Sequence, residues 1–272
     1  MALYMNGQEI SQSSGVPILG ATKPYIEEIY NSDGQLISAN MHGYDAIRSY
    51  MFSDCTKLAL NSLPSGITSI GKNAFQNCTN LALNSLPSGI TSIGSNAFSG
   101  CTNLALTSLP SGLTSISSYT FHSCSNLALT SLPSGITSIG LGAFLNCSKL
   151  ALTSLPSGIT SIKNNAFYSC TKLALTSLPS GLTSIGRDAF YYCPNLALTS
   201  LPSGLTDIGN NAFEKCTGLT SITFTGTPTS IGNRAFSNCT NLRTINVPWA
   251  SGAVANAPWG ATNATINYGY AG

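Results

Sequence analysis

Nine cysteines recur at a constant interval, and this interval constrains the fold more than any other feature of the sequence. Cys55 and Cys239, the first and the last, lie 184 residues apart, which is eight times 23 with no insertion. Self-similarity at a fixed period of about 20–50 residues is typical of solenoids and other repeat architectures. In such proteins each unit packs on copies of itself. The interval therefore predicts a stack of 23-residue coils.

The pattern within one unit predicts the path of the chain. The unit that begins at Cys55 reads CTKLALNSLPSGITSIGKNAFQN. Leucines at 58–63 form a short apolar stretch that a Pro-Ser-Gly turn ends, and isoleucines at 67–70 form a second stretch. Residues 74–78 have a spacing compatible with a single helical or 3₁₀ turn. We therefore expect a mostly β solenoid with parallel ladders between coils and a one-turn helical or 3₁₀ corner in each coil.

Both ends of such a stack expose apolar coil faces and need caps. The predicted solenoid covers residues 41–248. We interpret residues 1–40 as an N-terminal cap or anchor segment and residues 249–272 as a C-terminal cap, because the alternating TNATINYGY predicts a closing strand. Residues 1–54 hold six acidic and two basic residues, and the rest of the chain holds three acidic and nine basic ones. The acidic N-terminal segment is therefore a candidate for docking on an assembly.

The unit CxxL…LPSGITSIGxxAFxxC resembles the BspA-like (treponemal-type) leucine-rich repeat over residues 41–248. This resemblance implies a right-handed leucine-rich-repeat solenoid with a parallel sheet on its concave side. It also implies a bacterial surface protein, an adhesin or a phage-borne protein and not an enzyme. Most units here read LALTSLP, whereas the usual family strand is closer to LTSITIP, which only residues 219–224 and 242–247 resemble. The strand register of the main array stays open at this point.

Composition excludes several classes of function. Charged residues make up only 7% of the chain, and the formal net charge is +2. A general nucleic-acid binder needs clustered Lys and Arg, so we expect no nucleic-acid partner. No apolar run approaches the length of a membrane span, so we expect no membrane insertion. Residues 1–20 lack the basic start and unbroken apolar stretch of a signal peptide. We expect a protein that stays inside the cell, leaves by another route or is released with a particle such as a virion.

The sequence offers little for catalysis, cofactors or metals. Its two histidines, His42 and His122, are the only candidates for a general base, and it contains no GxSxG, HExxH or phosphate-binding motif. The cysteines lack the CxxC spacing of metal sites. Stacked coils would hold the thiols in parallel, which suits a disulfide poorly. We therefore expect no enzyme, no cofactor and no metal, and cysteines that fill buried slots and donate weakly to carbonyl groups.

One column varies while the scaffold columns stay fixed. The position two residues before each repeat cysteine changes in almost every coil, and we expect it to face outward. Its middle members form a ring-rich stripe that suits contact with a glycan or a protein. Surface drift without a ligand is the competing interpretation. The candidate contact residues, with two flanking ones, are His122, Leu145, Tyr168, Arg187, Tyr191 and Tyr192.

These features predict a non-enzymatic binding or display protein of a phage virion, such as a tail or fibre component that contacts the host surface. The ending VPWASGAVANAPWGATNATINY resembles the C-termini of repeat proteins carried by phages and prophages of gut bacteria. The expected partner is a protein or glycan on a cell surface, with virion proteins docking on residues 1–40. The alternatives are a bacterial cell-surface adhesin of the BspA-like kind and a purely structural spacer.

Overall fold

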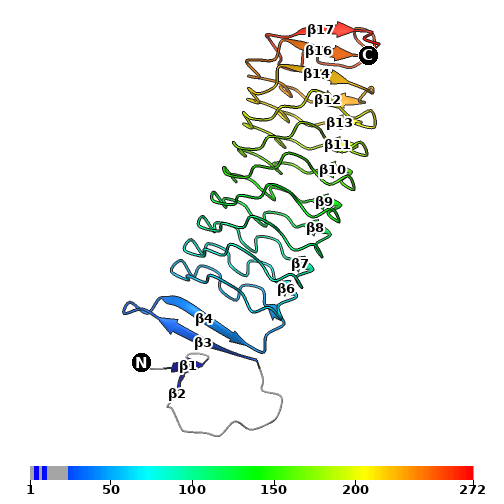
Figure 1. Ribbon diagram of the computed structural model, residues 1–272. Coiled ribbons are helices and arrows are strands. Elements are labelled where there is room, and N and C mark those ends of the chain that lie inside the picture. Colours follow the sequence, from blue (N-terminus) through cyan, green and yellow to red (C-terminus); the bar gives the residue numbers. More distant parts are fainter. Residues whose placement is uncertain (1–2, 6–7, 11–23, 272) are drawn as a thin grey trace.

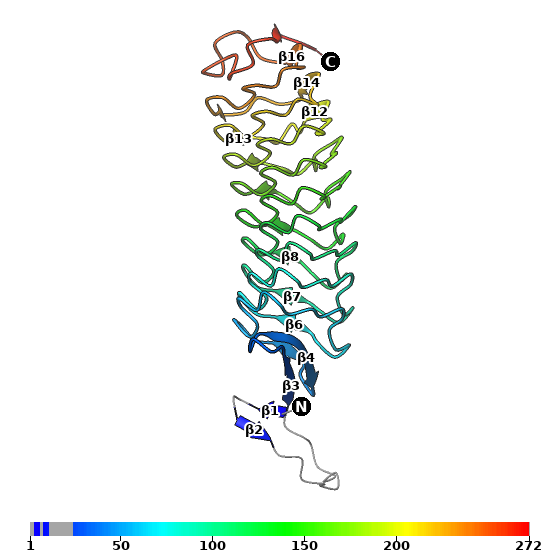
Figure 2. The same ribbon diagram turned by 90° about the vertical axis from the view of Figure 1, so that its left-hand side faces the viewer.

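The chain folds as a single stack of coils. The computed structural model describes residues 3–5, 8–10 and 24–271. Within this part it contains seventeen strands and no helix, and so none that could cross a bilayer. Figures 1 and 2 show the coils stacked in sequence order along one axis, with the N-terminal hairpin at one end and the C-terminal strand at the other. Successive coils pair in parallel with a shift of one repeat, as Ile70 does with Ile93. The predicted parallel solenoid is confirmed.

The strands form four sheets, and three of these are parallel. The antiparallel sheet, in the order β2-β1-β3-β4, contains β1 (Leu3–Met5), β2 (Gln8–Ile10), β3 (Tyr25–Tyr30) and β4 (Leu36–His42). The three-stranded sheet contains β5 (Ala46–Ile47), β6 (Ser69–Ile70) and β7 (Ser92–Ile93). The six-stranded sheet contains β8 (Ser115–Ile116), β9 (Ser138–Ile139), β10 (Ser161–Ile162), β11 (Ser184–Ile185), β13 (Asp207–Ile208) and β15 (Ser230–Ile231). The last sheet contains β12 (Ser200–Leu201), β14 (Ser221–Phe224), β16 (Thr244–Val247) and β17 (Thr265–Tyr268).

Identical side chains from successive coils fill the interior in continuous columns. Nine phenylalanines, from Phe52 to Phe236, are almost fully buried. Adjacent rings of this column stack with centroids 5.3–5.8 Å apart. Columns of leucine, isoleucine, alanine and cysteine belong to the same core. Each fully buried large apolar side chain stabilises the fold by about 1.5–3 kcal/mol, so burial between neighbouring coils holds the stack together.

The corner of each coil consists of turns, so the predicted helical or 3₁₀ corner is wrong. In one coil the Cys78 N–H donates to the Phe75 carbonyl, as in a turn. Asn73 and Asn77 have φ of 57° and 59°, in the left-handed region that interrupts a helix. The Phe75 N–H lies between these two residues and donates to Ala97 of the next coil at 2.8 Å. Two left-handed residues per coil therefore direct the corner amides to the neighbouring coil, and no helix can form.

Inward-facing positions decide where the long strands form. In β14 the buried Ile222 and Phe224 alternate with a more exposed residue, which is the period of a strand. In the first LALNSLP unit Leu58, Leu60 and Leu63 are buried, and both residues between Leu60 and Leu63 are exposed. This spacing of three breaks the strand period. A backbone hydrogen bond from the alanine of LAL to the preceding coil remains in much of the array, so the coils keep their register without a strand.

A glycine column lets successive coils approach closely beside the short Ser-Ile strands. A Cβ at Gly140 would lie 2.6 Å from the backbone nitrogen of Ser118, and the Gly140 N–H donates to the preceding coil at 2.9 Å. Ser117 and Lys163 occupy this column in two coils, and the equivalent backbone hydrogen bond is absent at both of these described positions. At Ser117 the hydroxyl donates to the Ile93 carbonyl at 2.8 Å instead, and the sheet is interrupted between β7 and β8.

Non-repeating segments cover both ends of the stack. At the N-terminal end, the Ile37 carbonyl of β4 accepts a hydrogen bond from Ala59 at 2.9 Å, and Met41 is buried. At the C-terminal end, β17 pairs in parallel with β16, and Trp249 and Trp259 are buried. The segment boundaries at residues 40 and 248 stay predictions. The parts of the predicted N-terminal segment that lie outside the described residues are 1–2, 6–7 and 11–23.

Candidate contact surface

The cysteine column belongs to the core. The Cys147 thiol donates to the Phe121 carbonyl of the preceding coil at 2.9 Å, and the other buried cysteines repeat this contact. All nine cysteines lie within the described residues, and none forms a disulfide. Burial raises the pKa of Cys78 and of Cys193 to about 12. The predicted role as a buried packing group is confirmed for eight of them, whereas Cys55 is half-buried.

Native protein should therefore react with a maleimide at Cys55 alone. The remaining thiols are buried and hydrogen-bonded, and a raised pKa leaves almost no thiolate at pH 8. Intact mass spectrometry before and after denaturation would count the modified thiols, with nine expected in the denatured chain. Labelling of several thiols in the native state, or disulfides found under non-reducing conditions, would contradict the buried column.

The described residues bring together no set of metal-ligating or catalytic side chains. No group of three or more His, Cys, Asp or Glu side chains among them could hold a metal ion. The ring of His122 lies 3.1 Å from the Ser99 hydroxyl, and burial lowers the pKa of His122. His42 stacks on Tyr25 and lies 3.9 Å from Glu27. The expectation of a non-enzymatic protein stays a prediction.

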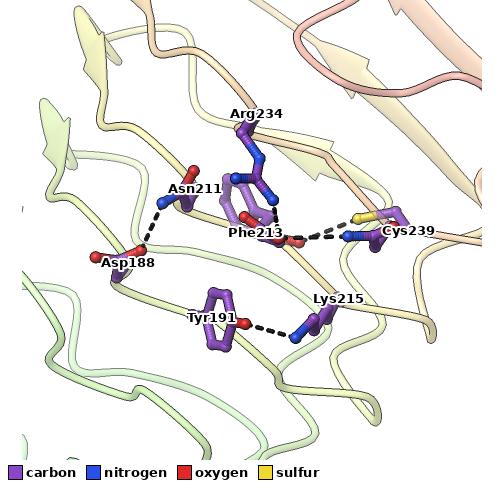
Figure 3. Close-up of polar contacts among 9 residues, drawn as sticks. Asp188, Tyr191, Asn211, Phe213, Lys215, Arg234 and Cys239 are labelled. Carbon is purple, nitrogen blue, oxygen red and sulfur yellow. Dashed lines mark hydrogen bonds and ion pairs between the residues drawn. The ribbon is translucent and has the colours of Figure 1, made fainter.

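Two of the predicted contact residues form the centre of a cluster at the turn edge of the stack. The rings of Tyr168 and Tyr191 stack with centroids 4.6 Å apart and an interplanar angle of 9°. Lys215, from the following coil, donates from Nζ to the Tyr191 hydroxyl at 2.6 Å (Figure 3). Its Nζ also lies 4.9 Å from the Tyr191 ring centroid, and the hydrogen bond raises the pKa of Lys215. We call Tyr168, Tyr191, Tyr192 and Lys215 the tyrosine edge.

The other predicted contact residues do not join this pair of stacked rings. Tyr192 follows Tyr191 in the chain and is 47% exposed. Leu145 is half-buried, as Tyr168 and Tyr191 are, and the polar contact of His122 is with the preceding coil. Arg187 donates to Asp188 at 2.9 Å and lines a cavity over the six-stranded sheet. Only the two stacked tyrosines therefore form a ring pair within the predicted stripe, and whether the stripe binds a ligand stays a prediction.

The variable column does not face outward throughout, contrary to expectation. Ser99 and Glu214 belong to this column and are buried. The Glu214 carboxylate accepts hydrogen bonds from Arg234 at 2.7 Å and from Asn238 at 3.3 Å. These contacts offset the cost of burying a carboxylate. Sequence analysis missed Arg234 and Lys215 because both stand in other columns and reach their partners across a coil boundary.

Sequence analysis also missed the left-handed corner positions. The residues five and one positions before each repeat cysteine have positive φ in all nine coils. Asparagine or glycine occupies many of these positions. Because these two residues tolerate positive φ best, their recurrence in the sequence could have predicted the left-handed corners. Bulky side chains at such angles are uncommon and carry strain of about 1–3 kcal/mol each. Those found here are Tyr50, Tyr119, Tyr192, Lys215 and Arg234. Two of these strained residues belong to the tyrosine edge.

Parallel 23-residue coils around leucine and phenylalanine columns define a leucine-rich-repeat protein. The family model described as BspA type leucine-rich repeat region matches residues 45–174 and 143–256. The chain belongs to this family, as the sequence resemblance predicted. The family relationship does not establish a place in a phage particle.

The chain is similar to several solved structures of bacterial leucine-rich-repeat proteins. One from Bacteroides ovatus is 20% identical with a TM-score of 0.58, and the match covers 92% of this chain and 76% of that one. A leucine-rich cell surface protein from Faecalibacterium prausnitzii is 22% identical with a TM-score of 0.44, covering 95% and 96% of the two chains. The Treponema pallidum leucine-rich-repeat protein is 26% identical with a TM-score of 0.47, covering 80% and 87%. No curated protein sequence matches the chain. The first of these structures supports the fold alone.

Proposed function

We propose that this protein is a non-enzymatic binding protein whose tyrosine edge contacts a partner on a cell surface. The observation that carries the proposal is the cluster of Tyr168, Tyr191 and Lys215. Aromatic and cationic groups held on a rigid scaffold lose little entropy on binding, and they are enriched among residues that dominate interface energies.

The geometry of the stack favours a protein partner at this edge. Tyr168 from the preceding coil covers one face of the Tyr191 ring, and the Lys215 ammonium from the following coil lies at the hydroxyl end of the ring. The face of Tyr191 that Tyr168 covers is therefore closed to a stacking sugar. The edge offers ring edges, hydroxyls and an ammonium group, which suit the carbonyl and carboxylate groups of a protein surface.

The setting that we favour is a phage virion, in which this chain is a tail or fibre component and residues 1–40 dock on other virion proteins. The acidic N-terminal segment and the resemblance of the C-terminal sequence to phage-borne repeat proteins support this setting. A bacterial cell-surface adhesin is the alternative, and membership of the BspA-type family supports it. Neighbouring genes distinguish the two: tail and holin genes indicate a virion, and sortase or secretion genes indicate a cell surface.

Replacing both stacked tyrosines should abolish attachment while leaving the fold intact. Loss of two aromatic anchors costs about 2 kcal/mol or more each at an interface, so Tyr168→Ala with Tyr191→Ala should weaken attachment at least a hundredfold. Loss of the ring–ring contact should cost the fold about 1 kcal/mol in addition to the burial of these two half-buried side chains. Flow cytometry of fluorescently labelled protein on a panel of intact gut bacteria would measure attachment, and circular dichroism would measure stability.

The matched control removes two tyrosines elsewhere on the surface. Tyr268 and Tyr270 are 38% and 42% exposed and lie near the C-terminal end of the stack, so Tyr268→Ala with Tyr270→Ala should attach like the wild type. Wild-type attachment by the Tyr168 and Tyr191 variant would show that the edge is not the contact surface. Absence of attachment by the wild type to every strain of the panel would favour the spacer interpretation.

A further inference from the structure

A groove runs over the six-stranded sheet. A cavity of about 630 Å³ lies over β8 and β9, and a cavity of about 530 Å³ lies over β10, β11, β13 and β15. Lys163 and Asn164 line both cavities, which therefore form one groove along the stack. Neighbouring strands lie about 4.8 Å apart, so the groove is roughly 24 Å long. Its length suits an extended chain better than a small molecule.

Lys163 stands in the middle of this groove, where the packing of the repeat favours glycine. The neighbouring coils have Gly140 and Gly186 at the same position, and their N–H groups donate to the preceding coils at 2.9 Å and 2.8 Å. The Lys163 N–H forms no such short hydrogen bond, although β9 and β10 stay paired at Ile139 and Ile162. Among the described residues Lys163 forms no ion pair. Packing between coils therefore gives no reason for this cation, whereas a ligand in the groove does.

The remaining lining supplies a second cation and a row of hydroxyl groups. The Arg187 side chain is 66% exposed, and its ion pair with Asp188 uses Nε. Asp207 lines the same end of the groove, and hydrogen bonds from Thr206 and Ser230 lower its pKa. Serine hydroxyls recur along the groove at Ser115, Ser138 and Ser184.

This lining matches sugars that carry negative charge. Hydroxyl and carboxylate groups exchange hydrogen bonds with sugar hydroxyls, and lysine and arginine bind carboxylates. Two cations over six strands are too few to track a nucleic-acid backbone, which carries a charge at every nucleotide.

We propose that this groove binds an extended polysaccharide that carries carboxylate groups. Lys163 and Arg187 contact the carboxylates, and the serine hydroxyls contact the sugar hydroxyls. This groove is a different surface from the tyrosine edge, and its proposed ligand goes beyond the function proposed for the tyrosine edge. The two proposals can therefore be refuted independently. Binding of purified polymer tests the groove, and attachment to intact cells tests the tyrosine edge.

Binding of polygalacturonate to Lys163→Gly tests the proposal. This variant places glycine at position 163, as in the neighbouring coils with Gly140 and Gly186. The residue 163 N–H should then donate to the preceding coil at the distance seen for those glycines, and the unfolding midpoint should rise. It should also weaken polygalacturonate binding at least about tenfold, since it removes a charge-assisted contact. The matched control is Lys149→Asn, which removes the same charge outside the groove and places the asparagine found at the equivalent Asn80, Asn103 and Asn126. This control should bind like the wild type.

Isothermal titration calorimetry at about 0.15 M salt, where exposed charges are screened, would compare three polymers. Wild type should bind polygalacturonate more tightly than neutral dextran and inorganic polyphosphate. Equal losses in Lys163→Gly and Lys149→Asn, or no binding of polygalacturonate by the wild type, would overturn the site. Tighter binding of polyphosphate would overturn the assignment to carboxylated sugars. A raised unfolding midpoint in Lys163→Gly shows that lost binding does not come from misfolding.

Discussion

Phe167→Ala should lower the free energy of unfolding by about 3–5 kcal/mol, the range for removing a fully buried ring. The Phe167 side chain has 0% relative exposure. Its ring stacks on Phe144 at 5.5 Å and on Phe190 at 5.4 Å, so the truncation removes two ring contacts and leaves a void across three coils. Neighbouring coils cannot close this void, because backbone hydrogen bonds such as that from Phe167 to Ala189 at 2.8 Å fix their spacing.

Urea unfolding followed by circular dichroism would measure this loss. Phe167→Leu is the control, since it keeps much of the buried volume and should cost markedly less than alanine. The neighbouring Tyr168 lies outside the phenylalanine column, and its truncation should also cost much less. An unchanged midpoint for Phe167→Ala would mean that the phenylalanines do not form a packed column.

The stacking of coils could be predicted because one repeat of constant length specifies every column at once. Cys55, Phe52 and Ile47 have the same relative positions as Cys78, Phe75 and Ile70, and equal spacing places each pair in register. The form of the corner could not be predicted from apolar spacing. That spacing is compatible with both a helical turn and a pair of turns, and the distinction depends on φ at Asn73 and Asn77.

The candidate site was predicted as a column but not as a set of contacts. Variation at Tyr168 and Tyr191 was visible in the sequence, and the two rings do stack. The partner Lys215 stands one position later in the next repeat, and only the offset between coils brings its Nζ to the Tyr191 hydroxyl. Burial of Glu214 was missed for the same reason, because its partner Arg234 comes from the following repeat.

The groove was not predicted from the sequence, because the residue that marks it, Lys163, is an exception in a column that is mostly glycine. Glycine in a repeat reads as a turn residue. The structure adds that a Cβ at Gly186 would lie 2.5 Å from the backbone nitrogen of Asn164. Close approach of two coils therefore requires glycine there, and Lys163 stands out only once this requirement is known.

Deleting residues 101–123 should leave a folded protein that is one coil shorter. The deletion joins Gly100 to Cys124, which has the position of Cys101 in the repeat, so every later column stays in register. Phe98 should then stack on Phe144, and the rod should shorten by about 4.8 Å. Stability in a solenoid is approximately a sum over repeats and their interfaces, so the loss should be limited to one repeat and one interface.

Deleting residues 101–111 should instead abolish the native fold, although it removes fewer residues. The shortened coil keeps only twelve residues between Gly100 and Cys124, too few for the path of a coil. Buried side chains on the two sides of the deletion then cannot meet in common columns. The coils before and after the deletion then form two separate blocks, each with an exposed apolar face. Such a chain should aggregate or unfold without cooperativity.

Thermal unfolding of these two deletion variants, followed by circular dichroism, tests the stacked-coil account most directly. The account predicts a sharp, cooperative transition for the variant without residues 101–123 and no native transition for the variant without residues 101–111. Equal tolerance of the two deletions would contradict it, because a chain indifferent to register cannot be a stack of 23-residue coils.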